Sequence, residues 1–429
     1  MDYKLSKYNV EFEDNDVVYC WNTYSGACIR LDNDGIEYVK QFNGKSDKSD
    51  YFEILKKNGF IVPQVIDETG RVLSEEKSTL QNMSPNRLCF TIAPGLNCNC
   101  NCSYCFESEN MNGLIMTEEV KRKVIEYIAY RIDKDKSIKI LNISWFGGEP
   151  LLYIDIIKSM SEEIMRICEN HGISYSAGIV TNGLLLDSDM VDVLALHKIK
   201  QAQVSIDDSE ESFCRVRNKT SQDFKTVLVN IRDASNKIKI SVRINADAYS
   251  NADRIKRIVD LLYGDYGLYG KVSVNLGFIR NQSISDEEEM ENHGKHAELQ
   301  RYLNEYIFSN YGNACNVVKS PKRRISGCLQ SCRANVCIGP EGEFYRCEHY
   351  FGDKLARIGD VDNGYYCNGF DNRYYVDTHM EKCLGCAFFP LCMGGCIDDR
   401  VNDRRIINCD KMRRGLIGMQ LSAIKNQEV

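Results

Sequence analysis

Residues 98–106 read CNCNCSYCF, and this run of cysteines sets the expectations for the rest of the chain. Within it, Cys98, Cys102 and Cys105 have the spacing C-x3-C-x2-C. Three such thiolates can hold three irons of a 4Fe–4S cluster and leave the fourth iron open to a small molecule. A zinc knuckle is the alternative interpretation. Cys100 lies inside the run and could form a tighter group with Cys102 and Cys105.

β-like runs and helical patterns alternate from about residue 88 to about residue 279. RLCFTIAP (87–94) ends just before the cysteines, and five more runs follow: ILNISWFG (140–147), AGIVTNG (177–183), QAQVSID (201–207), IKISVRINA (238–246) and KVSVNLGFI (271–279). After the first run, Thr117 can cap a helix whose apolar residues recur on one face: Val120, Val124, Ile128 and Ile132. Repeated βα units predict an α/β fold with parallel strands inside an outer layer of helices.

Glycine and polar residues occupy the expected strand ends. WFGGEPLL (145–152) contains Gly147 and Gly148, and glycine lets backbone carbonyls approach closely because it has no Cβ. The other candidate positions near strand ends are Glu149, Pro150, Asn182, Ser205, Asp207, Arg217 and Arg243. Each alone is a weak signal, but their order after the cysteine run indicates a shared site.

Composition and charge restrict the class of protein. The formal net charge of −7 argues against nucleic acid as the main partner, because phosphate binding requires a basic surface. No apolar run is long enough to span a membrane, and acidic residues stand where a signal peptide would be apolar. We therefore expect a cytoplasmic protein without a membrane partner. In a reducing cytosol, the 20 cysteines indicate metal or redox chemistry instead of disulfides.

The cysteine triad, the following Phe106 and the strand-end motifs resemble the signature of radical S-adenosylmethionine (SAM) enzymes. The resemblance implies a partial (β/α)6 barrel whose open iron chelates SAM, and it favours Cys98 over Cys100 as a ligand. Reductive cleavage of the sulfonium would yield methionine and a hydrogen-abstracting 5′-deoxyadenosyl radical. The implied cofactor contacts are Phe106, Gly147, Gly148, Glu149, Pro150, Asn182, Ser205, Asp207, Arg217 and Arg243, the last paired with the methionine carboxylate. Asp208 departs from the glycine, and Phe213 from the histidine, of many relatives.

Ten further cysteines lie between Cys328 and Cys409. Their spacing resembles the SPASM domain, an extension of radical SAM enzymes that mature peptides and proteins. The resemblance implies a first auxiliary 4Fe–4S cluster on Cys328, Cys332, Cys347 and Cys396, and a second on Cys383, Cys386, Cys392 and Cys409. Because the gap between Cys328 and Cys332 is short for this family, Cys337 could substitute, or an iron could stay open to substrate sulfur. Zinc ribbons are the alternative.

Glu348 directly follows Cys347. In sulfatase-maturating relatives an Asp at this position acts as a base, and a carboxylate beside a cluster could accept a proton. A solvated or hydrogen-bonded charge is the alternative reading of Glu348.

Before the first cysteine run, residues 1–82 form an expected small domain. Alternation over 8–22 and 27–32 predicts strands, and 36–42 and 51–62 read as helices. This layout resembles the winged-helix-like element that binds the leader of a ribosomal precursor peptide by strand addition. The expected domains are thus 1–82 for leader recognition, 86–310 for the radical SAM core, and 311–429 for a cysteine-rich SPASM domain with little apolar core.

The combined resemblances imply a peptide maturase that forms thioether crosslinks of the sactipeptide or ranthipeptide kind. Carbon–carbon crosslinking and formylglycine formation are close variants. The implied cofactors are SAM and three 4Fe–4S clusters, and the implied partners are a precursor peptide and an electron donor such as flavodoxin or ferredoxin. A zinc-stabilised peptide-binding protein is the non-enzymatic alternative, which predicts a colourless protein.

Overall fold

The computed structural model places the chain in two packing units. The first, here the terminal unit, comprises Met1–Gln81, Val318–Leu329 and Val376–Val429; the second, the sheet unit, comprises Asn82–Val317 and Gln330–Tyr375. The structure describes residues 1–81, 86–107, 113–279, 285–312, 319–325, 328, 332, 334–366, 369–375, 379–402 and 407–427. The expected boundary at residue 82 lies outside the described residues, and the three expected domains remain predictions.

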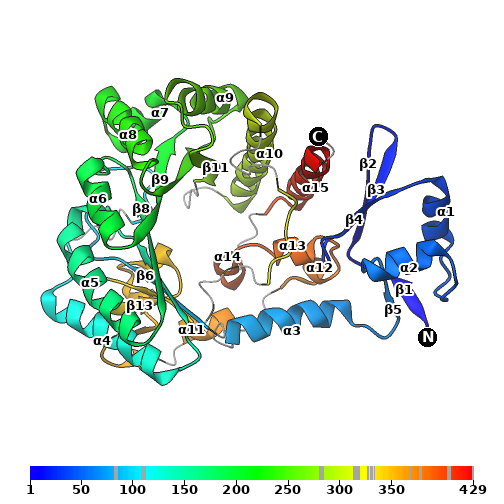
Figure 1. Cartoon of the computed structure of the whole chain (residues 1–429), viewed down its shortest axis with the longest axis horizontal. Coiled ribbons are helices and arrows are strands. Elements are labelled where there is room, and N and C mark those ends of the chain that lie inside the picture. The colour runs from blue at the N-terminus through cyan, green and yellow to red at the C-terminus, as the bar shows by residue number, and fades with distance from the viewer. Residues whose placement is uncertain are drawn as a thin grey trace. The chain divides into compact units, whose positions relative to one another are not determined.

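A ten-stranded, mostly parallel sheet forms the centre of the sheet unit (Figure 1). Six neighbouring strands run parallel in chain order: β6 (Arg87–Ile92), β7 (Ile140–Trp145), β8 (Ser174–Thr181), β9 (Ile199–Asp207), β10 (Lys239–Ala246) and β11 (Val272–Phe278). Each of the six runs expected from the sequence overlaps one of these strands, although β8 and β9 begin three and two residues before their runs. The prediction of an α/β fold with a parallel sheet is therefore confirmed.

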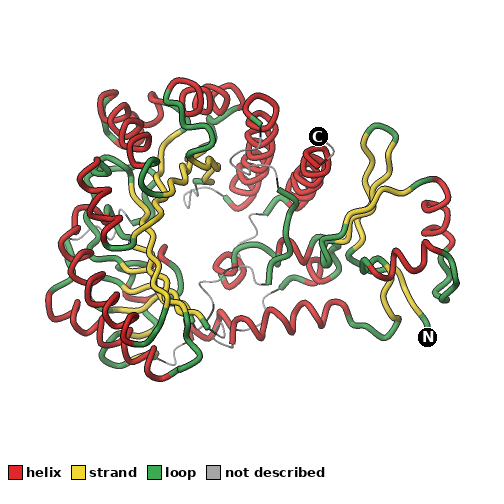
Figure 2. The backbone as a smooth tube through the Cα atoms, viewed as in Figure 1, coloured by secondary structure: helices red, strands yellow, loops and turns green. Residues whose placement is uncertain are grey.

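Helices cover one face of this sheet, as the red coils beside the yellow strands show (Figure 2). They are α4 (Glu118–Lys134), α5 (Ile154–Asn170), α6 (Ser188–Leu196), α7 (Glu210–Arg217), α8 (Ser221–Ala234), α9 (Ala252–Asp260) and α10 (Asp286–Tyr311). As predicted, Thr117 caps α4 by accepting from the Val120 amide, and Val124 and Ile128 are buried against the strands. Leu88 and Phe90 of β6 face this apolar layer, so Cys89 and Thr91 project to the opposite face.

Four C-terminal strands extend the sheet beyond β6. β12 (Asn335–Ile338) pairs parallel with β6, and β13 (Glu343–Tyr345), β14 (Gly359–Asp360) and β15 (Gly364–Tyr365) follow antiparallel. Val336, Ile338 and Phe344 are fully buried in the main core. The expectation that the segment after residue 311 has little apolar core is therefore wrong for this part, because its strands are completed by β6. The short α11 (Gly369–Asn372) follows.

The N-terminal part of the terminal unit is built from two small sheets. β1 (Tyr3–Leu5) pairs with β5 (Ile61–Pro63), and β2 (Asn9–Asp14), β3 (Val17–Asn22) and β4 (Cys28–Leu31) form an antiparallel sheet. Asn15 and Asp16 adopt φ of 50° and 61°, which gives the two-residue hairpin turn between β2 and β3. α1 (Asn33–Gln41), α2 (Asp50–Lys57) and the longer α3 (Glu68–Gln81) complete it. The strands expected over 8–22 and 27–32 and the helix expected over 36–42 are present, but the helix expected over 51–62 ends at Lys57, because Ile61–Pro63 pairs with β1 as strand β5.

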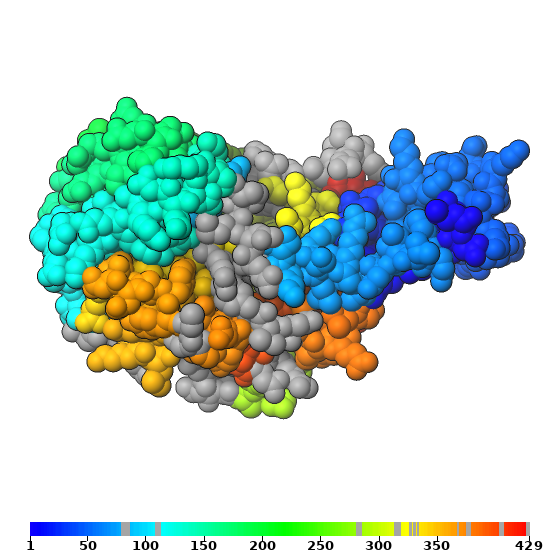
Figure 3. All heavy atoms as spheres, turned by 90° about the horizontal axis from the view of Figure 1, so that it is seen from below, coloured from blue at the N-terminus to red at the C-terminus, as the bar shows by residue number. Residues whose placement is uncertain are grey.

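C-terminal helices pack on this N-terminal part within the same unit. They are α12 (Glu381–Leu384), α13 (Phe389–Cys392), α14 (Ile397–Val401) and α15 (Cys409–Gln427). The Trp21 and Phe388 rings meet edge to face at 6.2 Å, and Thr23 donates to the Ala387 carbonyl. In the space-filling view, the blue and orange surfaces of the two chain ends adjoin (Figure 3). No described helix is long and apolar enough to cross a membrane.

Candidate active site

The loop after β6 holds the cysteine triad, and its thiols differ in acidity. A hydrogen bond from Cys100 outweighs burial and lowers the pKa of Cys98 to about 6. The same partner, Cys100, lowers the pKa of Cys102, whereas burial raises the pKa of Cys105 to about 12. The Cys100 side chain is 5% exposed, lies between Cys98 and Cys102, and is hydrogen-bonded to both. Among the described residues, no three potential ligands are gathered closely enough for a metal ion.

The two glycines after β7 pack directly against the backbone that leads into this loop. A Cβ on Gly147 would come 2.4 Å from the Gly95 carbonyl oxygen, and one on Gly148 would come 2.3 Å from that of Asn97. Gly147 also has φ of +115°, which favours glycine. Both positions therefore require glycine if the cysteine loop is to keep its backbone conformation.

Glu149 joins the ends of β7 and β8. Its carboxylate is fully buried and accepts from the Thr181 hydroxyl at 2.8 Å, the Asn182 amide at 2.8 Å and the Leu151 amide at 3.0 Å. Burial outweighs these bonds and raises the pKa of Glu149 to about 7. The Asn182 side chain continues the chain of contacts, since its amide lies 3.7 Å from Cys98 Sγ. Two of the expected cofactor contacts are thus tied to the first cysteine.

Asp207 and Arg217 form a buried ion pair at the carboxyl end of β9. Arg217 Nε donates to Asp207 Oδ2 at 2.5 Å, and each side chain is about 2–3% exposed. Burial alone would lower the pKa of Arg217, but the Asp207 carboxylate raises it above its ordinary value. Arg217 Nη2 is buried and has no hydrogen-bond partner among the described residues. Arg217 Nη2 can therefore donate a hydrogen bond to an anionic group. The Arg217 guanidinium also lies close enough to Cys102 for its charge to lower the pKa of that thiol.

Tyr104, inside the cysteine run, connects this pair to β10. Its hydroxyl donates to Asp207 Oδ1 at 3.0 Å and accepts from Asn245 Nδ2 at 3.0 Å. Arg243 lies in the same strand as Asn245, opposite Ser205 of β9, and donates to the Asn245 side chain at 3.2 Å. Gly277 on β11 leaves room for the Arg243 guanidinium, because a Cβ there would come 2.0 Å from Nε. The sequence reading missed Tyr104, although an aromatic residue between two cysteines was a visible signal.

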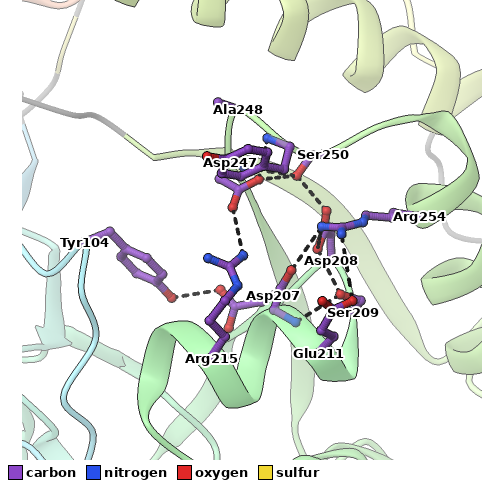
Figure 4. Close-up of polar contacts among 12 residues, drawn as sticks. Tyr104, Asp207, Asp208, Ser209, Glu211, Arg215, Asp247, Ala248, Ser250 and Arg254 are labelled. Carbon is purple, nitrogen blue, oxygen red and sulfur yellow. Dashed lines mark hydrogen bonds and ion pairs between the residues drawn. The ribbon is translucent and has the colours of Figure 1, made fainter. Parts of the chain in front are cut away.

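Asp208 is a second residue whose role the sequence did not reveal. It is 2% exposed, accepts from the Ser250 hydroxyl at 2.7 Å, and lies 3.7 Å from Arg254 Nη1 (Figure 4). Arg254 also donates to Ser212 of α7 at 3.2 Å. The carboxylate therefore ties the loop after β10 to α9 and α7, which carries Arg217.

Glu348 and Phe106 lie near the cysteine loop. The Phe106 and His349 rings are 4.4 Å apart, and Phe106 also stacks on Phe146 at 6.5 Å. Burial raises the pKa of Glu107 to about 8, and the charges of Cys98 and Glu348 contribute. The Glu348 carboxylate itself accepts from Cys347 Sγ at 3.8 Å.

The cysteines expected to bind the second auxiliary cluster are mutual neighbours in the terminal unit. Burial raises the pKa of Cys392 to about 11, and the charges of Cys383 and Cys409 add to it. Burial, together with the charges of Cys409 and Cys386, raises the pKa of Cys383, and Cys386 Sγ accepts from Arg413 Nη2 at 3.3 Å. For the first auxiliary cluster, Cys332 and Cys347 belong to the sheet unit, and Cys328 and Cys396 to the terminal unit.

Comparisons with known proteins bear on this arrangement. Residues 92–262 match the model of the radical SAM superfamily. The structure of native anSMEcpe with bound AdoMet is similar at 17% identity and a TM-score of 0.55, covering 79% of this chain and 97% of that one. Streptococcus suis SuiB is similar at 16% identity and a TM-score of 0.51, covering 92% of this chain and 96% of that one. Comparison with curated protein sequences gives no match. Residues 92–262 therefore match a radical SAM domain, and this match supports radical SAM enzyme activity for the chain.

Proposed function

We propose that the chain installs thioether crosslinks, from cysteine sulfur to carbon, in a ribosomally made precursor peptide. The observation that supports a precursor peptide as the substrate is the extent of the likeness to SuiB, which covers 92% of the chain, whereas the likeness to anSMEcpe covers 79%. SuiB has been solved bound to its precursor peptide SuiA, and anSMEcpe with the Kp18Cys peptide. A bound peptide is the element that these two structures share.

The residues at the carboxyl end of the sheet fit SAM and a 4Fe–4S cluster. Cys98, Cys102 and Cys105 supply thiolates, and the unpaired Nη2 of Arg217 supplies a donor for an anionic group. When bound, the cofactor and cluster supply one-electron chemistry that removes a hydrogen atom from the substrate. We assign the remaining cofactor contacts to Phe106, Gly147, Gly148, Glu149, Pro150, Asn182, Ser205, Asp207 and Arg243.

Glu348 is the proposed base. Thioether formation removes two hydrogens from the peptide, so a proton and a surplus electron must leave along with the abstracted hydrogen atom. Two contacts support this role: the Glu348 carboxylate accepts from Cys347 Sγ at 3.8 Å, and the neighbouring His349 ring packs on Phe106, which follows the triad. Two auxiliary 4Fe–4S clusters would take up this surplus electron, and an electron donor such as flavodoxin or ferredoxin would supply the electron that cleaves SAM.

The N-terminal sheet is the proposed leader-binding element. In the order β2–β3–β4, both β2 and β4 are edge strands among the described strands. An edge strand offers free main-chain donors and acceptors to an extended peptide. The leader would therefore bind as a further strand while the core of the peptide reaches the radical SAM domain.

Anaerobic incubation with SAM, reductant and the precursor peptide encoded beside this gene tests the proposal. Mass spectrometry should show a loss of two hydrogens at unchanged peptide length and a cysteine that resists alkylation. The Cys102→Ala variant, which cannot complete the triad, should leave the peptide unmodified. A peptide that loses its cysteine sulfur to formylglycine, or links two carbons with its thiol still free, would contradict thioether formation.

A further inference from the structure

One cysteine outside every expected ligand set lies on the face of the sheet opposite the helices. Cys89 of β6 is directly opposite Asn142 of β7 and Asn335 of β12. Residues directly opposite one another in a sheet project to the same side. Since Leu88 and Phe90 fill the helix side, Cys89, Asn142 and Asn335 form a row on the other face.

Two expected cluster ligands reach the same row. The Asn335 amide donates to the Cys332 carbonyl at 2.9 Å, and the Cys89 amide donates to the Ala334 carbonyl at 3.3 Å. The turn that carries Cys332 is therefore held beside Cys89, and the charge of Cys332 influences that thiol.

Cys347 approaches from the other side of β12. β13 runs antiparallel to β12 with Tyr345 opposite Cys337, so the chain after Tyr345 runs back toward Asn335. Arg346 holds this part of the chain beside β12, because its Nη1 donates to the Cys332 and Asn335 carbonyls at 3.4 Å each. The Arg346 side chain is 1% exposed and pairs with Asp371 at 2.5 Å.

The neighbouring strand β7 provides a hydrogen-bond donor for the Cys89 sulfur. Asn142 Nδ2 donates to Cys89 Sγ at 3.7 Å, and hydrogen bonds to sulfur accompany and tune cluster ligands. Cys337, the substitute considered from the sequence, is instead enclosed by Ala93, Leu96, Tyr345 and Phe351. A four-iron cube separates its cysteine sulfurs more widely than a single ion does, so the absence of a single-ion group among the described residues fits a cube.

We propose that Cys89, together with Cys332 and Cys347, ligates the first auxiliary 4Fe–4S cluster, in the place expected for Cys328. The inference rests on the proposed function, because that proposal supplies the cluster. It explains why the short Cys328–Cys332 spacing is tolerated, because β6 supplies the ligand in the place of Cys328. On binding iron, the Cys89 thiol gives up its proton.

The test starts from a Cys98→Ala, Cys102→Ala, Cys105→Ala variant, so that only auxiliary clusters contribute to the spectra. After anaerobic reconstitution, Cys89→Ser should change the electron paramagnetic resonance signal or the midpoint potential of one cluster, or lower the iron content by up to about four atoms per chain. Cys328→Ser should leave the electron paramagnetic resonance signal, the midpoint potential and the iron content at the parent's values. The inference would be overturned if Cys328→Ser changed these properties and Cys89→Ser left them unchanged.

Alkylation of the otherwise unmutated protein gives an independent readout that does not depend on how the Cys89→Ser variant folds. Mass spectrometry should show Cys89 protected in the reconstituted protein and modified after iron removal under mild denaturation. Cys214 of α7, which belongs to no expected ligand set and is partly exposed, should be modified in both states. Equal labelling of Cys89 in both states would refute ligation. A parent protein that holds no iron–sulfur cluster at all would instead refute the proposed function.

Discussion

Arg217 and Asp207 are joined at 2.5 Å with both side chains almost wholly withdrawn from solvent. Tyr104 bonds the same carboxylate, so one buried pair links β9, α7 and the cysteine loop. Removing one partner of such a pair leaves an uncompensated buried charge. The pair is therefore expected to act on both stability and the shape of the cluster loop.

The Asp207→Asn variant should lower the free energy of unfolding by about 3 kcal/mol, because Arg217 keeps its charge without a carboxylate partner. Urea unfolding of the metal-free protein measures this loss. Glu126→Gln breaks an exposed i,i+4 pair with Arg122 and should cost less than about 0.5 kcal/mol. An equal loss of unfolding free energy in the two variants would show that the buried pair stabilises the fold no more than the exposed pair does.

Glu149 should make stability depend on pH. Its pKa is raised from 4.5 to about 7 in the folded chain, so between these values the native state binds more protons than the unfolded state. Stability should therefore be greatest below pH 4.5 as far as this group is concerned, and fall as the pH rises toward 7. Denaturation midpoints of metal-free protein at pH 5 and pH 7.5 should differ less in Glu149→Gln than in the parent. A variant that retains the parent's full pH dependence would rule out Glu149 as the source.

Gly148→Ala should disturb the cysteine loop. The added Cβ would stand 2.3 Å from the Asn97 carbonyl oxygen, next to Cys98, so the backbone must shift at a cost of about 1–3 kcal/mol. We expect iron bound by the triad to fall several-fold, measured in a variant background that lacks the later cysteines. Gly369→Ala is the matched control, because nothing lies within 4 Å of its Cβ. Full iron incorporation by Gly148→Ala would show that the cysteine loop can shift to accommodate the added Cβ and still bind iron.

Asp208→Asn should weaken SAM binding through position instead of direct contact. The change removes the charge that Arg254 faces and weakens the anchor at Ser250, so α7 loses part of its support. We expect the KM for SAM to rise about tenfold with a smaller change in kcat, and stability to fall by about 1–3 kcal/mol. Asp233→Asn, which affects only an exposed pair with Arg232, should change neither. An unchanged KM with lowered stability would mean that Asp208 only supports the fold.

Local sequence determined the six parallel strands, the Thr117-capped helix and the order of the motifs at the strand ends, because hydrophobic period and capping act over a few residues. It also placed Cys98, Cys102 and Cys105 in one loop and Glu149 at a strand end. These features depend on neighbours in the chain and so can be read from it directly.

Only the tertiary structure decided which distant segments meet. Pairing of β12 with β6, the packing of Phe388 on Trp21, and the partners of Asp208 and Cys89 each join residues far apart in sequence. A strand's edge or a buried carboxylate can be satisfied by many segments of suitable polarity, and local pattern does not choose among them. That choice follows from how the whole core is filled, which is why the role of Asp208 and the position of Cys89 emerged only in three dimensions.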